Sequence, residues 1–309
     1  MGYKAIDTHC HPLPDKYFKY INDTGKIHQD KCPFYDWSED LTLDFMKRVE
    51  IERAILWISS PNIHAGDDKQ ARGIARELNE EMTELAKKHK DIIYYVALLP
   101  LPDVDGAAEE VKYAADRLGV TGFTLNTNMN GMYLGNPAMD PVLKLLDERG
   151  SLVIIHPTRP AAVPEGVLDN MPIPMIEFMF DSTRALVNMM MEGTLKKFPN
   201  IRWLIPHCGG TLPYLVDRLV QTARKSGLYD GHEQMQKLYF DIAGGSLPRQ
   251  LPLLMSIVGE DRIVYGTDWG FKNVEECIEK KKDVEEFELL THEQKEKIFY
   301  NNAAKLLGI

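Results

Sequence analysis

The sequence contains little cysteine, and its cysteines form no recognisable framework. Cys10, Cys32, Cys208 and Cys277 are the only four, and their spacing shows neither a paired set nor a CxxC zinc motif. This argues against a disulfide-stabilised extracellular domain and against a cysteine-ligated structural zinc site. We therefore expect reduced thiols in a cytoplasmic protein.

Long hydrophobic runs and blocks of positive charge are also missing. No uninterrupted apolar stretch reaches the roughly 20 residues of a membrane-spanning helix, and the chain begins without an apolar signal region. The 36 basic and 46 acidic residues give a net charge of -10 without any cluster of lysine and arginine. These absences argue against a membrane or a nucleic acid as partner, whereas a few local cations would suffice for a small anionic substrate.

Histidines and an aspartate follow short apolar runs at four places in the chain. His9 and His11 are two residues apart, so their side chains point the same way on a strand. His156, His207 and Asp268 each follow a later run. A barrel of parallel strands collects side chains at the C-terminal ends of its strands, so these five residues could form one metal site. The three later runs are 152–155, 201–206 and 262–265.

Short apolar runs alternate with longer amphipathic segments along the chain, a pattern typical of repeated βα units. We predict one α/β domain over residues 1–309, a (β/α)8 TIM barrel of the metal-dependent hydrolase type. Strands are predicted near 3–8, 53–59, 92–99, 120–126, 151–156, 201–206, 237–242 and 262–267. Helices are predicted at 68–89, 104–118, 139–149, 175–198, 212–225, 247–258 and, after a capping box that begins at Thr291, up to about Leu307.

Two segments interrupt this alternation. Residues 12–40 are too long for an ordinary βα loop, and we expect an excursion that covers the catalytic face or packs on the surface. Residues 157–174 contain five prolines, which would stiffen a loop over the mouth of the barrel. The methionines that follow, from Met175 to Met191, suggest a homodimer contact, with core packing as the alternative.

The order and surroundings of these motifs resemble the amidohydrolase superfamily, and most closely the branch of aminocarboxymuconate-semialdehyde decarboxylase and the 2-hydroxybenzoate decarboxylases. The resemblance covers nearly the whole chain. It begins with Asp7-Thr8-His9-Cys10-His11. The further motifs that carry it are Asp181-Ser182-Thr183-Arg184-Ala185, Phe198-Pro199-Asn200-Ile201, His207-Cys208-Gly209-Gly210-Thr211-Leu212-Pro213, Tyr239-Phe240-Asp241, Gly266-Thr267-Asp268-Trp269 and Asn302-Ala303.

The resemblance implies a role for each matching residue of the site. His9, His11, His156 and Asp268 match the metal ligands of the family, and His207 matches its catalytic histidine. One divalent metal is implied. Zn²⁺ is the first expectation because three imidazoles and a carboxylate suit it, and Mn²⁺ is the alternative.

Two differences between this sequence and other branches of the superfamily restrict the number of metals and the reaction that the site is expected to support. Binuclear relatives carry a bridging lysine on the fourth strand, and residues 122–126 contain none, which favours a single metal. Deaminases of the superfamily place a glutamate after the histidine of the fifth strand, whereas here Pro157, Thr158 and Arg159 follow His156. Deamination is therefore disfavoured.

The resemblance implies decarboxylation of a small aromatic or unsaturated carboxylic acid. No arginine precedes Arg48, whereas the semialdehyde decarboxylase uses one after its first strand, so a 2-hydroxybenzoate of the 6-methylsalicylate kind fits better than a dicarboxylate. An arginine could pair with the substrate carboxylate and aromatic side chains could stack on its ring. The candidates for these contacts are Arg184, Arg159, Trp269, Phe271 and Trp57. The alternatives are core packing for Trp57, an exposed position for Arg159 and, from the resemblance, a contact with a dimer neighbour for Arg184.

In the expected reaction a proton adds to the ring carbon that bears the carboxylate, and carbon dioxide leaves as the ring regains its aromaticity. Asp268 or His207 would carry this proton. The same ligands could instead activate a water molecule that hydrolyses a lactone, ester or amide. A metal-binding barrel without catalytic activity is the third alternative.

Overall fold

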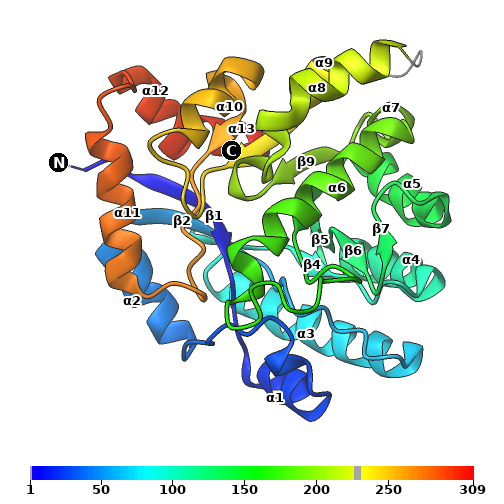
Figure 1. Ribbon diagram of the computed structural model, residues 1–309. Helices are drawn as coiled ribbons and strands as arrows, with labels where there is room; N and C mark the ends of the chain where they lie inside the picture. Colours follow the sequence, from blue (N-terminus) through cyan, green and yellow to red (C-terminus); the bar gives the residue numbers. More distant parts are fainter. Residues whose placement is uncertain (1, 226–230) are drawn as a thin grey trace.

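Parallel strands form the centre of the molecule, and helices surround them (Figure 1). The computed structural model describes residues 2–225 and 231–309. Within these residues the parallel strands form two sheets, of order β1-β2-β3 and β11-β10-β9-β8-β5-β4, and β6 pairs with β7 in a small hairpin. The strands are β1 (Ala5–Cys10), β2 (Ile51–Leu56), β3 (Ile93–Tyr95), β4 (Ala97–Leu98), β5 (Gly122–Asn126), β6 (Asn128–Met129), β7 (Met132–Tyr133), β8 (Leu152–His156), β9 (Arg202–Ile205), β10 (Tyr239–Asp241) and β11 (Ile263–Val264).

Backbone hydrogen bonds join the two sheets into a closed barrel. Val96 alone separates β3 from β4, so these two segments are parts of one strand that belongs to both sheets. On the other side, the amide of Thr8 donates to the carbonyl of Tyr265 over 3.0 Å, and Cys10 forms a parallel bridge with Trp269. The sheets therefore contribute eight barrel strands, β1, β2, β3 with β4, β5, β8, β9, β10 and β11. The predicted barrel and each of its eight strands are confirmed.

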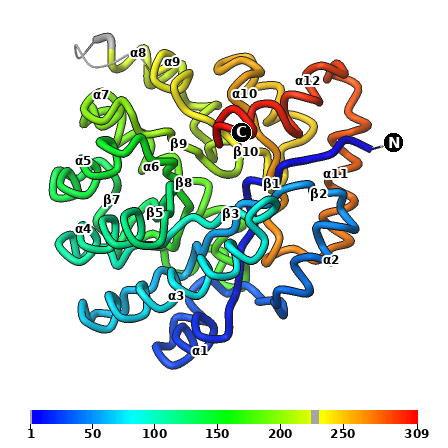
Figure 2. The backbone as a smooth tube through the Cα atoms, turned by 180° about the vertical axis from the view of Figure 1, so that it is seen from behind, coloured from blue at the N-terminus to red at the C-terminus, as the bar shows by residue number. Residues whose placement is uncertain are grey.

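Helices follow the strands on the outside of the barrel, as Figure 2 shows from behind. Each predicted helix is present, although several are broken by a short 3-10 or π-helical turn. The α-helices are α1 (Asp15–Asp23), α2 (Glu39–Val49), α3 (Asp68–Lys88), α4 (Val104–Tyr113), α5 (Asp140–Glu148), α6 (Glu177–Met191), α7 (Thr194–Lys197), α8 (Leu212–Lys225), α9 (Gly231–Met235), α10 (Gln250–Val258), α11 (Val274–Glu286), α12 (His292–Glu296) and α13 (Asn302–Leu307).

The region around residues 12–40 is more helical than expected. Within it, α1 buries Tyr17, Tyr20 and Ile21, whose spacing of three and four residues places them on one helix face. Further on, the side chain of Ser38 accepts a hydrogen bond from the amide of Leu41 and caps α2. The remaining part of this segment, residues 24–38, connects the two helices.

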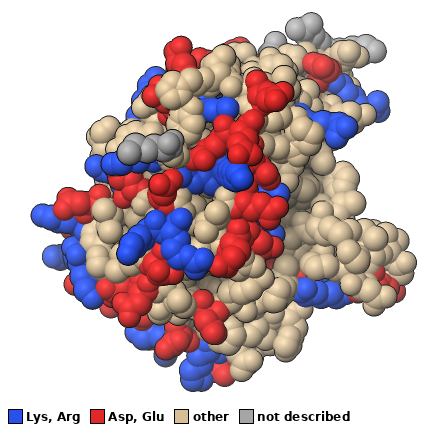
Figure 3. Space-filling model, turned by 90° about the vertical axis from the view of Figure 1, so that its left-hand side faces the viewer, with Lys and Arg blue, Asp and Glu red and all other residues tan. Residues whose placement is uncertain are grey.

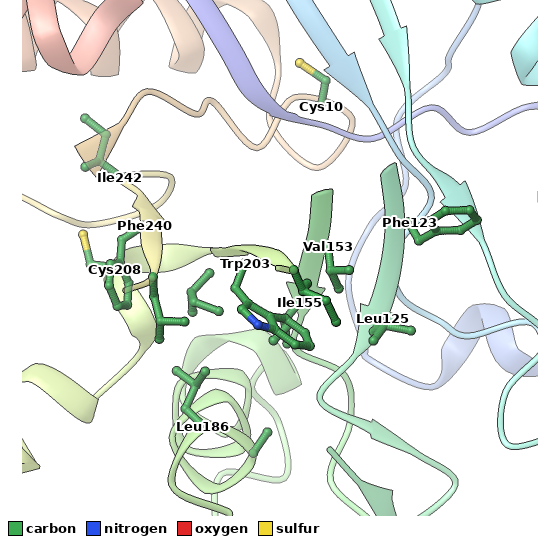
Figure 4. Packing of buried hydrophobic residues seen from close by; sticks show 14 of the residues in the cluster. Cys10, Phe123, Leu125, Val153, Ile155, Leu186, Trp203, Cys208, Phe240 and Ile242 are labelled. Carbon is green, nitrogen blue, oxygen red and sulfur yellow. The ribbon is translucent and has the colours of Figure 1, made fainter. Parts of the chain in front are cut away.

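Two hydrophobic layers hold the barrel together. The inner layer includes Ile6, Ile55, Leu152 and Leu204, and the end of the barrel opposite the site is filled by Ala303 and Leu306 of α13. The outer layer lies between strands and helices, and Figure 4 shows Val153 and Ile155 of β8 next to Trp203 of β9 within it. Strands buried on both faces need apolar side chains at every position, which explains their nearly continuous apolar sequences.

Strand β1 departs from regular alternation just before the predicted metal ligands. Ile6 packs inside the barrel, whereas Ala5 and Cys10 pack outside it. Strict alternation from Ile6 would turn His9 outward, but the register with β2 shifts between Asp7 and Cys10. This irregularity directs His9 into the barrel, and re-aiming a side chain in this way is a frequent use of a β-bulge beside a site.

Acidic and basic side chains intermingle on the face formed by α2 and α11 (Figure 3). Arg48 pairs with Glu275 across these two helices at 2.6 Å, and Lys281 lies 3.3 Å from both Glu50 and Glu285. Among the described residues, no helix has both the length and the apolar character needed to cross a membrane.

Candidate metal centre and active-site cavity

The five side chains predicted to bind a metal or to act in catalysis beside it lie close together at the C-terminal end of the barrel. His9 and His11 lie at the end of β1, and His156 is the last residue of β8. His207 follows β9, and Asp268 follows β11. The ligand atoms of His9, His11 and His156 lie within 4.8 Å of one another, and so do those of His9, His207 and Asp268.

Hydrogen bonds behind the rings of His9 and His11 fix which nitrogen faces the site. Nδ1 of His9 donates to Oδ2 of Asp241 over 2.8 Å, and Nδ1 of His11 donates to the carbonyl oxygen of Trp57 over 3.1 Å. With Nδ1 protonated, a neutral ring presents the lone pair of Nε2. The two Nε2 atoms lie 2.9 Å apart and so point to the same place.

Asp241 is a site residue to which the sequence analysis gave no role. Its side chain is fully buried, and its Oδ1 accepts the backbone amides of His207 at 2.9 Å and Ala243 at 3.0 Å. Since Oδ2 bonds to His9, one carboxylate orients that ring and also fixes the backbone at His207. Asp241 ends an apolar strand and faces into the barrel. The end of an apolar strand identified His156 from the sequence, and the same position could have identified Asp241.

The loop after β11 places Asp268 against the two histidines of β1. Its amide donates to the carbonyl of His9 over 2.9 Å, and its Oδ1 lies 3.4 Å from Nε2 of His9 and 3.3 Å from Nε2 of His11. Asp268 has a φ of 66°, and His207 has a φ of 54°. Non-glycine residues rarely adopt this left-handed conformation, and they do so mostly where surrounding contacts impose it, as at functional sites.

Glycine is required beside these ligands. A Cβ atom on Gly266 would lie 2.7 Å from Cβ of His9 and 3.3 Å from Cβ of Asp241. The fully buried Asp7 supports the same junction, because its carboxylate accepts the amides of His9 at 3.0 Å and Thr267 at 3.1 Å. The ends of β1 and β11 are therefore held at a fixed separation.

The histidines and acids of this cluster strongly affect one another's charge. Burial disfavours a charged His9, but Asp241 and Asp268 outweigh burial and raise the pKa of His9 to about 10. Burial lowers the pKa of His156 well below its usual range and that of His207 to about 4, and neighbouring histidines add to both shifts. Burial would raise the pKa of Asp268, but hydrogen bonds from His11 and His9 lower it well below the usual range. Burial also lowers the pKa of His11, so among these four histidines His9 alone carries a proton that a bound cation would displace.

The donor set fits a divalent metal ion. His9, His11 and His156 are buried, and Nδ1 of His156 and Nδ1 of His207 have no hydrogen-bond partner within residues 2–225 and 231–309. Buried polar nitrogens without a partner cost free energy, and binding to a cation or a ligand would compensate it. Three imidazoles with one carboxylate match the donors that Zn²⁺ prefers and also suit Mn²⁺.

A cavity of about 570 Å³ opens over this cluster. His156, His207 and Asp268 contribute to its lining, while His9 and His11 lie behind them. The ring of Phe271 packs edge-on against His11 with centroids 5.0 Å apart, and the ring of Phe178 packs edge-on against His156 at 5.9 Å. The other lining residues are Asp30, Cys32, Pro33, Phe34, Tyr35, Ser60, Pro172, Pro174, Met175, Met179, Ala243, Gly244, Gly245, Gln250, Lys272 and Glu276.

Of the five side chains predicted to contact substrate, Phe271 alone lines this cavity. Trp57 is fully buried and donates its indole N–H to the carbonyl of Thr8, and Trp269 stacks on Phe45 in the outer core.

The two arginines predicted to contact substrate also lie away from the cavity lining. Arg159 donates to the carbonyl of Gln29 over 2.8 Å, and Arg184 is exposed on α6.

Among the described residues, Lys272 is the one lysine or arginine that lines the cavity, and it was not among the residues predicted to contact substrate. Within the described part of the chain its ammonium group forms no ion pair. Lys272 directly follows Phe271 in the segment after the last strand. This position in the sequence could have identified it as a residue of the site.

Cys208 takes no part in this chemistry, because it is fully buried in the outer core with Phe240 (Figure 4), and burial raises the pKa of its thiol.

Residues 6–309 match the family model described as amidohydrolase. Decarboxylase macB of Penicillium terrestre is 31% identical over 289 residues, which cover 87% of this chain and 85% of the fungal protein. The 6-methylsalicylic acid decarboxylase of Penicillium expansum is 28% identical over 276 residues, which cover 85% of this chain and 84% of that protein.

Solved structures are also similar. An amidohydrolase II structure is 36% identical, covers 99% of this chain and 100% of its own, and superposes with a TM-score of 0.96. A dihydroxybenzoic acid decarboxylase from Polaromonas sp. JS666, solved with bound manganese and the inhibitor 2-nitroresorcinol, shares the fold with a TM-score of 0.84 at 20% identity. That alignment covers 100% of this chain and 97% of the other.

Proposed function

The chain belongs to the amidohydrolase family, and from this we propose that it is a metal-dependent decarboxylase of a small aromatic carboxylic acid, such as a 2-hydroxybenzoate. One observation carries the proposal. The cavity combines His156, His207 and Asp268 on one wall with the rings of Phe178 and Phe271 beside them. Edge and face contacts with phenylalanine rings suit a flat aromatic substrate. The 6-methylsalicylic acid decarboxylase of Penicillium expansum, 28% identical, supports this substrate class.

We propose that His9, His11, His156 and Asp268 hold one divalent metal. Zn²⁺ is the first choice from the donor set, and the manganese in the Polaromonas structure supports Mn²⁺ as the alternative. A cation held there would bind the carboxylate and the ortho oxygen of the substrate and stabilise negative charge on them.

Asp268 is the proposed proton carrier. Asp268 is a carboxylate, because hydrogen bonds from His11 and His9 outweigh burial and lower its pKa. A carboxylate beside the substrate could take up the proton of the ortho hydroxyl. It then delivers this proton to the ring carbon that bears the carboxylate. The carbon–carbon bond to the carboxylate breaks, its electron pair restores the aromatic ring, and carbon dioxide leaves. The phenolate that remains takes a proton from water.

His207 and Lys272 complete the proposed arrangement. His207 lines the cavity and is neutral because burial lowers its pKa to about 4, so its ring can exchange a hydrogen bond with the substrate oxygen. Lys272 supplies a positive charge that attracts the carboxylate into a cavity whose lining also contains the acidic residues Asp30, Asp268 and Glu276.

The test is NMR spectroscopy in D₂O with metal-loaded protein and a panel of 2-hydroxybenzoates that includes 6-methylsalicylate. We expect loss of the carboxylate signal and deuterium at the vacated ring carbon of at least one compound. Protein that holds metal but leaves the whole panel unchanged would contradict the proposal and direct the search to ester, lactone and amide hydrolysis.

A homodimer and a cytoplasmic location remain predictions. Exposed apolar side chains gather around the start of α6 and the loop before it, which supports a dimer contact there. They are Val167, Leu168, Met171, Met175 and Phe180. Light scattering should give twice the mass of one chain, and Phe180→Glu should lower it to that of one chain.

A further inference from the structure

Asp30 is a buried acid in the wall of the cavity, and it takes no part in the proposed reaction steps. Its side chain is 6% exposed. Oδ2 accepts a hydrogen bond from Oγ of Ser60 over 2.8 Å, whereas Oδ1 is buried and has no hydrogen-bond partner among the residues that the structure describes. A buried carboxylate oxygen that forms no hydrogen bond is costly, so a donor is missing at this place.

Protein cations near Asp30 do not supply this donor. Arg159 and Lys26 lower the pKa of Asp30, but burial outweighs them and raises it to about 6. Arg159 donates to the carbonyl of Gln29, and Lys26 donates to Oδ1 of Asn62 over 3.0 Å. Both cations thus favour the ionised form of Asp30 without bonding to it, and Oδ1 remains available to accept a hydrogen bond.

Three separate parts of the chain fix the position of Asp30. Its carbonyl accepts the amide of Ile173 over 3.0 Å, which ties it to the proline-rich loop. Ser60 follows β2, and its Oγ also lies 3.1 Å from Oγ1 of Thr158, which follows β8. A side chain held in this way can discriminate between ligands, because it cannot turn away from an unsuitable one.

Asp30 belongs to the same cavity as the proposed proton carrier. Burial raises the pKa of the Cys32 thiol to about 11, and the charges of Asp30 and Asp268 add to this shift while Lys272 opposes it. Cys32 therefore lies within electrostatic range of all three groups, and all four line the cavity. A small aromatic molecule between them would meet Asp268 at one point and Asp30 at another.

We propose that Asp30 determines substrate specificity by accepting a hydrogen bond from a second hydroxyl or amino group on the aromatic ring, distinct from the ortho hydroxyl. The inference rests on the proposed function. A ring with a methyl group at this position leaves Oδ1 unpaired, whereas a ring hydroxyl pairs with it. Sites that hydrogen-bond a substrate group reject analogues without that group strongly, because the buried partner then stays unsatisfied.

The experiment compares wild type, Asp30→Ala and Asp30→Asn on salicylate, 6-methylsalicylate and the four dihydroxybenzoates that keep the 2-hydroxyl. Carbon dioxide release gives kcat/KM, and calorimetry gives the affinity of each compound. We expect wild type to prefer at least one dihydroxybenzoate, and Asp30→Ala to lower kcat/KM for it by about 10- to 100-fold. Activity on salicylate and 6-methylsalicylate should change less than about threefold.

Asp30→Asn keeps the size of the side chain and one acceptor oxygen, so it should fold normally and retain part of the preference. Ser60→Ala tests the contact that holds Asp30 in place: it removes the bond to Oδ2 but keeps the carboxylate, so it should reduce the same preference less than Asp30→Ala does. Equal losses on all compounds, or no loss on any, would overturn the role of Asp30. Wild type that binds metal but neither binds nor decarboxylates any compound would overturn the proposed function, and this inference with it.

Discussion

Oδ2 of Asp241 lies 2.8 Å from Nδ1 of His9, and both side chains are fully buried. A carboxylate behind a metal-binding histidine fixes the ring and makes its other nitrogen a better donor. The same carboxylate accepts the amide of His207, so a single residue from β10 links a proposed metal ligand to the proposed catalytic histidine.

Replacing Asp241 by alanine should weaken metal binding by about 10- to 100-fold, because His9 loses the bond that orients it. Competition with a chromophoric chelator measures the affinity for Zn²⁺ and Mn²⁺. Asp30→Asn is the control, since this buried acid touches none of the proposed ligands and should leave the affinity unchanged. Equal affinities of Asp241→Ala and wild type would show that His9 needs no such partner.

Metal affinity should rise with pH. His9 is protonated in the metal-free protein below its pKa of about 10, whereas burial keeps His156 and His207 neutral near pH 7. A cation must displace that one proton, so the affinity should increase about tenfold per pH unit between roughly pH 7 and 9 and level off above the pKa of His9. Chelator competition with Mn²⁺ across this range gives the slope. An affinity that does not change with pH would mean that His9 binds the metal without losing a proton.

Replacing His207 by alanine should leave the metal in place and lower kcat by about 100-fold or more, as expected for a residue that handles a proton or a charged oxygen. His156→Ala should instead remove the metal. The metal content of each variant, measured by atomic emission, and its turnover rate together distinguish a catalytic residue from a metal ligand. Loss of metal from His207→Ala would make this residue a ligand, which the grouping of His9, His207 and Asp268 would also permit.

Replacing Lys272 by methionine should raise KM for a benzoate at least several-fold and change kcat less, because the proposed role is to attract and orient the carboxylate. The effect should shrink at high salt. Arg184→Met is the matched control, since Arg184 is exposed and does not line the cavity. If the arginine variant shows the larger rise in KM, the prediction made from the sequence is right and the role given to Lys272 is wrong.

Gly266→Ala should destabilise the protein by about 1–3 kcal/mol and weaken metal binding, since the added Cβ would lie 2.7 Å from Cβ of His9. Gly73→Ala places the same methyl group in α3, where nothing lies within 4 Å, and should be neutral or stabilising. Thermal unfolding and chelator competition measure both effects. Similar melting temperatures for the two variants would show that His9 can move aside at no cost.

The sequence by itself determined the barrel and the identity of the five residues at its centre. Buried parallel strands must be apolar on both faces, so their runs are visible without a structure. Because such strands end at one edge, His156, His207 and Asp268 could be placed together across more than a hundred residues of chain. Helix α2 could also have been predicted, since its buried residues Thr42, Phe45, Met46 and Val49 follow a helical period. It was missed because it lies next to the segment that was expected to be a loop.

Only the tertiary structure decided what surrounds these residues. Strict alternation would turn His9 away from the barrel, and the irregular register between β1 and β2 turns it inward. The cavity wall comes from loops whose side-chain directions follow no period, so Lys272 and Asp30 line it while Arg159 and Arg184 do not. Local sequence indicates the buried face of a regular strand, but packing between distant segments sets where an irregular strand turns a side chain and which loop residues face a ligand.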